Sequence, residues 1–114
     1  MISPVLDRAD LDLSELEAKA DQVAAVMKAL ANPRRLLILC KLAEVGAASV
    51  NSLAAAISLS QSALSQHLAV MRDEGLVTFD RDRQTLHYRI ADPRIVALLD
   101  TLYQLYCAPS GDSQ

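Results

Sequence analysis

Cys40 and Cys107 carry the most reactive side chains of this sequence. A cysteine thiolate is a nucleophile and a soft metal ligand, whereas a buried thiol often only fills space in a core. Two cysteines are too few for the disulfide scaffold that stabilises small secreted domains. Each thiol is therefore either inert in a core or reactive, and the residues alone leave both interpretations open.

The two histidines, His67 and His87, do not complete a catalytic or metal site. A cysteine enzyme needs a histidine and an orienting group within reach of its thiol, and neither histidine is placed for that role. The chain also lacks a glycine-rich phosphate loop. A zinc or cadmium site needs three or four converging ligands. We expect no enzymatic activity, no cofactor and no metal, and a site built from the two cysteines and a carboxylate is the open alternative.

A run of short polar side chains at residues 60–67 indicates a different chemistry, the recognition of DNA. Ser, Gln and His residues form one face of this segment, and Leu64, Leu68 and Met71 lie on the opposite face. Short polar side chains near the start of a helix let its backbone approach base edges in the major groove. An ordinary surface helix more often exposes Glu and Lys. We predict a DNA-reading helix, and the alternative is a neutral solvated face.

Capping residues and helical periodicity place this segment in a mainly helical chain. Ser14 and Glu17 form a predicted capping box, after which apolar residues recur at helical spacing up to Leu30. Asn32-Pro33 ends that helix and begins the next, which is apolar on nearly every side and is expected at the centre of the domain. Three more helices are predicted, from Val50 to Ile57 with Ser49 as cap, from Gln61 to about Glu74 with Ser60 as cap, and from Asp92-Pro93 to Cys107.

Residues 76–80 and 85–90 have the shorter period of two β-strands, so residues 81–84 are predicted to form a hairpin tip. Arg81 and Arg83 at this tip can reach a phosphate or the minor groove. Neighbouring acidic residues favour the alternative, a solvated turn. Two further arginines, Arg34 and Arg35, are predicted with equal weight either to contact phosphate or to pair with a nearby carboxylate.

A short helix, a tight turn, a longer helix and a hairpin together describe a winged helix-turn-helix of about five helices with a two-stranded wing. The DNA contacts that we predict on it come from the first helix of the motif, the reading helix and the wing. They are Ser49, Ser60, Gln61, Ser62, Ser65, Gln66, His67, Arg72, Arg81, Arg83 and Gln84.

Length and composition agree with one DNA-binding domain. The chain has 114 residues, of which 52% are apolar and 22% charged, with a net charge of -3. An acidic total does not exclude DNA, because binding depends on where the basic residues lie. We expect an N-terminal arm at 1–11, the domain at 12–107 and a disordered tail at 108–114. The N-terminus lacks a signal sequence and no apolar run is long enough to cross a membrane, so the expected location is the cytoplasm.

Two segments resemble the signature of the ArsR/SmtB-type winged-helix repressors: Asn32-Pro33-Arg34-Arg35-Leu36, and Leu59 to Leu68 with the sequence LSQSALSQHL. Leu76-Val77 and His87 to Ile90 are similar to the wing strands of that family, and the resemblance covers residues 12 to 107. It implies a bacterial homodimer in which the first and last helices form the interface. It also implies that an inducer lowers the affinity for double-stranded operator DNA.

Within that family, the chain is similar to the persulfide-sensing subgroup that includes BigR and SqrR. The thiols of one family metal site are absent from Ser49 to Leu53, and the last helix has no histidine. Cys40 in the second helix and Cys107 at the end of the last helix correspond to the subgroup's two thiols. The resemblance implies that reactive sulfur species are the inducer, and that they bridge this redox-sensing pair through two or more sulfurs. The alternative is a family repressor that responds to general oxidants or to a metal.

Apolar side chains on the two terminal helices exceed what one small core can hide, which independently favours an obligate homodimer. The residues that we expect at this interface are Leu13, Leu16, Val96, Leu99 and Tyr103.

Overall fold

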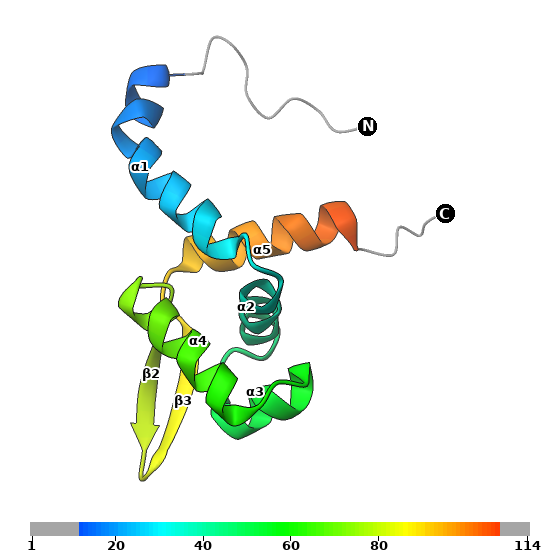
Figure 1. Cartoon of the computed structure of the whole chain (residues 1–114). Helices are drawn as coiled ribbons and strands as arrows, with labels where there is room; N and C mark the ends of the chain where they lie inside the picture. The colour runs from blue at the N-terminus through cyan, green and yellow to red at the C-terminus, as the bar shows by residue number, and fades with distance from the viewer. Residues whose placement is uncertain (1–11, 108–114) are drawn as a thin grey trace.

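The computed structural model describes residues 12–107, so the predicted N-terminal arm and the predicted disordered tail lie outside the described residues. Five helices and three short strands follow one another along this part of the chain. They are α1 (Leu13–Leu30), α2 (Pro33–Val45), β1 (Ala48–Ser49), α3 (Val50–Ile57), α4 (Gln61–Asp73), β2 (Val77–Asp82), β3 (Thr85–Ile90) and α5 (Pro93–Tyr106). The predicted winged helix-turn-helix is confirmed (Figure 1).

Local capping bonds begin the helices where the sequence predicts, with one exception. Asn32 accepts from two backbone N–H groups of α2, and Ser49 and Ser60 each accept one at the start of α3 and α4. The predicted capping box of Ser14 with Glu17 is wrong, because Asp12 is the cap of α1. Its carboxylate accepts from the Ser14 hydroxyl at 2.7 Å and from the Ser14 N–H at 3.0 Å. These bonds, led by the hydroxyl's, lower the pKa of Asp12.

Helix α2 lies at the centre of the domain, as its apolar sequence predicts. Its side chains Ile38, Leu39 and Leu42 are completely or almost completely buried. They pack with Leu53 from α3 and with three buried residues of α4 in one core cluster. Because α4 contributes its apolar face to this core, its polar face is turned outward.

The strands form one antiparallel sheet in the order β1-β3-β2. The sequence predicts only the β2–β3 hairpin. Strand β1 is too short to show a period, and it exists because Ala48 and Ser49 pair with Tyr88 and His87 of β3. The hairpin is also tighter than predicted, since Asp82 pairs with Thr85. Its turn therefore consists of two residues, 83 and 84, in place of the four-residue tip.

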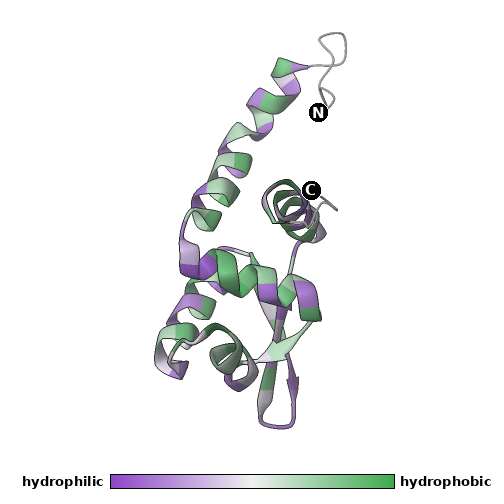
Figure 2. Cartoon of the chain, turned by 90° about the vertical axis from the view of Figure 1, so that its right-hand side faces the viewer, coloured by the Kyte–Doolittle hydropathy of each residue, from purple (hydrophilic) through white to green (hydrophobic). Residues whose placement is uncertain are grey.

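Helix α1 extends away from the helix-turn-helix, whereas α5 crosses α2 and packs against it, as Figures 1 and 2 show. Leu13 and Leu16 on α1 and Val96 and Tyr103 on α5 are exposed, as the dimer prediction requires. Leu99 was predicted to lie with them, and this is wrong, because only 2% of its surface is exposed and it packs in the core. Over residues 12–107 no helix is long and apolar enough to span a membrane.

Candidate DNA-binding surface and thiol pair

Helix α4 exposes the polar face that the sequence predicts. Gln61, Ser62, Ser65 and Gln66 are exposed, whereas His67 is partly buried. Ser60 is exposed too, but its hydroxyl oxygen accepts the Ala63 N–H at 3.0 Å as the helix cap. The three leucine and methionine side chains on the other face are fully buried and hold the helix in place. The result is a row of exposed polar groups on one face of a helix whose other face is held in the core, and base reading by this face stays a prediction.

Ser49 lies at the junction of β1 and α3, where its hydroxyl is occupied by local bonds. The oxygen accepts from the Ser52 N–H at 3.2 Å and is paired with the Ser52 hydroxyl at the same distance. These bonds set the direction in which α3 leaves the sheet. A DNA contact by Ser49 stays a prediction.

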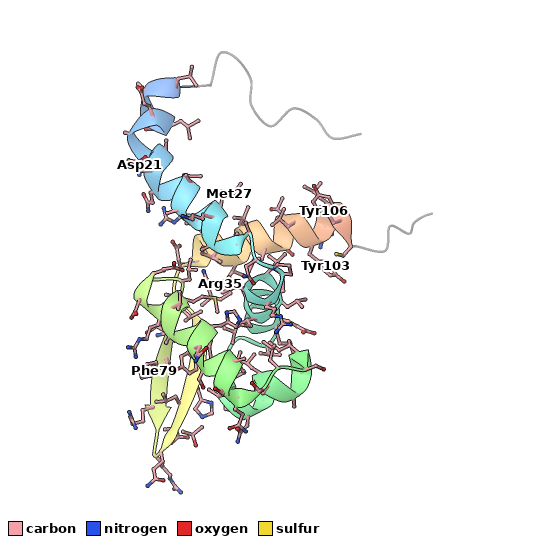
Figure 3. All side chains as sticks on the ribbon, viewed as in Figure 1. Asp21, Met27, Arg35, Phe79, Tyr103 and Tyr106 are labelled. Carbon is pink, nitrogen blue, oxygen red and sulfur yellow. The ribbon has the colours of Figure 1, made fainter. Side chains whose placement is uncertain are left out.

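Arg72, a predicted DNA contact, makes an interaction inside the protein. Its guanidinium carbon lies 5.2 Å from the centre of the Phe79 ring on β2. That ring packs in turn against Tyr88 on β3, with 5.3 Å between ring centres. Figure 3 labels Phe79 on the β2–β3 hairpin. This cation–π contact joins the end of the reading helix to the base of the wing, so it fixes one relative to the other. Phe79 and Tyr88 were missed as positioning residues, although Phe79 is the only phenylalanine of the chain.

The wing tip presents Arg81, Arg83 and Gln84, all exposed. Of the acidic neighbours that favour a neutral turn, Asp80 is bound to Arg89 across the strands at 3.0 Å. Neither Arg81 nor Arg83 has a salt bridge within residues 12–107. The tip therefore carries two exposed arginine side chains without an acidic partner in this part of the chain, and their contact with a phosphate backbone stays a prediction.

Arg35 is paired with a carboxylate of the protein. Its guanidinium lies 3.4 Å from the carboxylate of Glu74 at the end of α4, and its Nε is buried. Of the two roles left open for Arg35, pairing with a carboxylate is the one that the structure shows. The pair connects the start of α2 with the end of the reading helix.

Gln66→Ala is expected to weaken operator binding by about 1–3 kcal/mol and to relax preference at one base position of each half-site. The amide of Gln66 is exposed on the reading face, and alanine keeps the helix while removing both hydrogen-bonding groups. Fluorescence anisotropy against single-base operator variants measures the change. Gln22→Ala, which removes an exposed amide from α1, is the matched control. Wild-type affinity and preference in Gln66→Ala would contradict the assigned reading face.

Arg83→Gly is expected to change stability and DNA affinity in opposite directions. Arg83 has φ of +60°, a left-handed conformation that is costly for any residue with a Cβ. Glycine relieves that cost, so the free energy of unfolding should rise by up to about 1 kcal/mol. Loss of the cation should weaken binding to all sequences alike and flatten its salt dependence. Thermal unfolding and salt titrations of DNA binding measure the two effects, and an unchanged salt slope would exclude a phosphate contact.

The two thiols lie on packed helices. Cys40 is partly buried on α2, and Cys107 is exposed at the C-terminal end of α5, where its N–H donates to the Tyr103 carbonyl at 2.8 Å. Burial raises the pKa of the Cys40 thiol, and the negative charge of the Cys107 thiolate raises it further. Helices α2 and α5 pack against each other, so the two thiols belong to neighbouring helices. In the described part of the chain, no three His, Cys, Asp or Glu side chains are grouped to hold a metal ion.

Comparison with known proteins agrees with this architecture. The model of the bacterial regulatory protein, arsR family, matches residues 32–78. The chain is 46% identical to the HTH-type transcriptional regulator YgaV of Escherichia coli over 84% of its own length and 97% of that protein. It is 41% identical to the transcriptional activator HlyU of Vibrio cholerae, over 91% and 95% of the two chains.

Solved structures show the same likeness in three dimensions. The transcriptional repressor BigR of Xylella fastidiosa superposes with a TM-score of 0.79 at 35% identity, over 86% of this chain and 99% of that one. Reduced HlyU of Vibrio cholerae superposes with a TM-score of 0.75 at 41% identity, over 82% and 98% of the two chains. A winged helix-turn-helix with these relatives, aligned over almost their whole length, is a transcriptional regulator, and the chain belongs to the ArsR family.

Proposed function

We propose that this protein is a homodimeric repressor that leaves its operator when sulfane sulfur joins Cys40 to Cys107. One observation carries the proposal: two free thiols lie on α2 and at the end of α5, and these two helices pack against each other. The same domain exposes an unblocked polar reading face on α4. DNA binding and thiol chemistry thus reside in one small unit.

Two copies of the chain supply the spacing that operator DNA requires. Exposed apolar side chains lie on α1 and α5. These two helices are at the end of the domain opposite the wing tip (Figure 1), so we propose that pairing through them leaves α4 free. A two-fold dimer places two reading helices about 34 Å apart, one turn of the duplex. The proposed operator is therefore palindromic, with base contacts from Ser62 and Gln66 and backbone contacts from Arg81 and Arg83.

The proposed switch reaction needs two thiols and one organic persulfide. A thiolate of the pair attacks the outer sulfur of R–S–SH, which releases RSH and leaves a protein persulfide. The second thiolate attacks the inner sulfur of that persulfide, which expels sulfide and forms the disulfide. Two electrons pass from the two thiols to the sulfane sulfur, so no further oxidant is needed. With longer sulfur chains, the bridge retains additional sulfur atoms.

A bridge between α2 and α5 can affect DNA binding because α2 also contacts the reading helix and α5 also belongs to the proposed dimer interface. Helix α2 bears Arg35, which is paired with the end of α4, and α5 bears the exposed Val96 and Tyr103 of the proposed dimer interface. A shift of α5 therefore changes the distance between the two reading helices. The bridged form must disfavour the DNA-competent dimer by about 1–3 kcal/mol, which is a 5- to 150-fold change in affinity.

A mobility-shift assay with the DNA upstream of the protein's own gene tests the proposal. The reduced protein is expected to bind, inorganic polysulfide to release it, and mass spectrometry to show loss of both free thiols together with any added sulfur. Peroxide is run in parallel, and release by peroxide alone would indicate a general oxidant sensor. A transcription assay gives the sign of regulation, which matters because BigR is named a repressor and HlyU an activator.

A further inference from the structure

A groove of about 950 Å³ lies between α2 and α5, and Cys40 is part of its wall. The rest of the wall is mainly apolar. It includes Leu37 and Ile57, together with Val96 and Tyr103, which the groove shares with the proposed dimer interface. This volume fits a small organic molecule, and ligand sites of this kind are concave and mostly apolar with few polar groups. Cys40 is only partly buried, so a molecule in the groove can reach its sulfur.

The charged residues of this groove give it a net negative charge. Lys41, Glu44 and Asp100 are its charged residues. The Lys41 ammonium lies 3.0 Å from the Glu44 carboxylate, which neutralises it. Asp100 is exposed and has no salt bridge among residues 12–107. The groove therefore has one uncompensated negative charge above an apolar wall.

We propose that this groove is the binding site for the sulfur donor, and that it selects uncharged, apolar sulfane-sulfur compounds over anionic ones. The inference rests on the proposed function and adds its substrate class. An apolar donor loses water-exposed surface in the groove, which favours binding. An anionic donor must give up its hydration there and also meets the Asp100 carboxylate. The same burial raises the pKa of the Cys40 thiol, which agrees with a site that disfavours negative charge.

The first covalent step can be written for a dialkyl trisulfide, R–S–S–S–R. The Cys40 thiolate attacks the central sulfur, the bond from that sulfur to one outer sulfur breaks, and RS⁻ leaves and takes up a proton. Cys40 then carries –S–S–S–R, counting its own sulfur. The Cys107 thiolate attacks the middle sulfur of this chain and releases a second RSH. The products are a bridge of three sulfurs and two thiols, so sulfur, hydrogen and electrons balance.

The experiment compares two trisulfides of similar size, the uncharged dipropyl trisulfide and the anionic trisulfide of mercaptopropionate. The full-length Cys107→Ser protein is used, because it stops at the first adduct on Cys40. The rate of adduct formation is followed by mass spectrometry. Each rate is divided by the rate of the same protein unfolded in urea, which removes the intrinsic reactivity of the donor. The ratio of the folded-protein rate to the unfolded-protein rate is expected to be at least about 10-fold larger for dipropyl trisulfide than for the anionic trisulfide.

Charge removal isolates the contribution of Asp100. Asp100→Asn is expected to raise the rate with the anionic donor by about 3- to 10-fold and to leave the apolar donor almost unchanged. Asp73→Asn, an exposed carboxylate of α4 outside the groove, changes the net charge equally and is expected to have no effect. Added salt should also accelerate only the anionic donor.

The possible outcomes distinguish failure of the proposed donor site from failure of the proposed thiol switch. Equal ratios for the two donors, or an Asp100→Asn effect matched by Asp73→Asn, would refute the donor site while leaving the thiol switch intact. Absence of any adduct with either donor, together with operator binding that neither donor affects in the wild-type protein, would refute the proposed function itself.

Discussion

Cys40→Ser and Cys107→Ser proteins are expected to bind operator DNA with wild-type affinity and to stay bound when polysulfide is added. Neither residue lies on the exposed face of α4 or on the wing, so the reading surface is preserved. Each variant keeps one thiol, which can be persulfidated but not bridged. The 5- to 150-fold loss of affinity on treatment should therefore disappear in both.

Two controls make this result specific to the bridge. Cys40→Ala tests whether a hydroxyl in a partly buried position is itself harmful, and thermal unfolding of every variant shows that the fold persists. The operator bound by treated and untreated protein is measured at one salt concentration, because DNA affinity depends strongly on salt. A Cys107→Ser protein that polysulfide still releases would show that a single modified thiol is sufficient, against the proposed bridge.

Val23→Asp is expected to convert the dimer into a monomer and to reduce operator affinity by about 100-fold or more. Val23 is 45% exposed on α1, on the same face as the exposed Leu16 and Met27. A two-fold interface would contain this substitution twice, so two carboxylates would lose their hydration when the helices pair. A monomer reaches only one half-site, and it loses the 10²- to 10⁴-fold gain that two linked contacts provide.

Gln22→Asp is the matched control for the dimer. It introduces the same charge one position away, where α1 carries an exposed polar side chain. Analytical ultracentrifugation at micromolar concentration and anisotropy with a complete operator measure the two effects. A Val23→Asp protein that sediments as a dimer would place the interface elsewhere. A monomer that retains full affinity would show that pairing is not needed for DNA binding.

Short-range signals in the sequence were enough to predict most of the helices. Asn32-Pro33 and Asp92-Pro93 mark helix starts, because an Asx side chain caps the first turn and proline needs no hydrogen-bond partner there. The reading face was predictable for a similar reason. Leu64, Leu68 and Met71 recur at the helical period, so the polar residues between them must face outward.

Short-range sequence signals gave the wrong prediction where two local conformations of similar free energy compete. Asp12 and Ser14 can both cap α1, and the structure uses the earlier carboxylate. The hairpin turn has no glycine, so the sequence did not indicate that Arg83 adopts the left-handed conformation and shortens the loop to two residues. In both cases the alternatives differ by one or two residues and by a small free energy.

Contacts between residues distant along the chain were decided by the tertiary structure alone. Strand β1 exists only because β3 is there to pair with it. Arg72 carries a charge that suits DNA equally well, and only the position of the Phe79 ring draws it toward the wing. Leu99 has the spacing of an interface residue but turns into the core.

The thiol pair shows most clearly which properties follow from local sequence and which follow from tertiary packing. The sequence by itself established two cysteines on two predicted helices and a reading helix with a polar face. Helical period and capping are local properties, and they do not report which helices pack together. The packing of α5 on α2 places the two thiols on neighbouring helices, and it forms the groove that Cys40 lines. Burial and charge act through space, so the chemical environment of each thiol was decided by the fold.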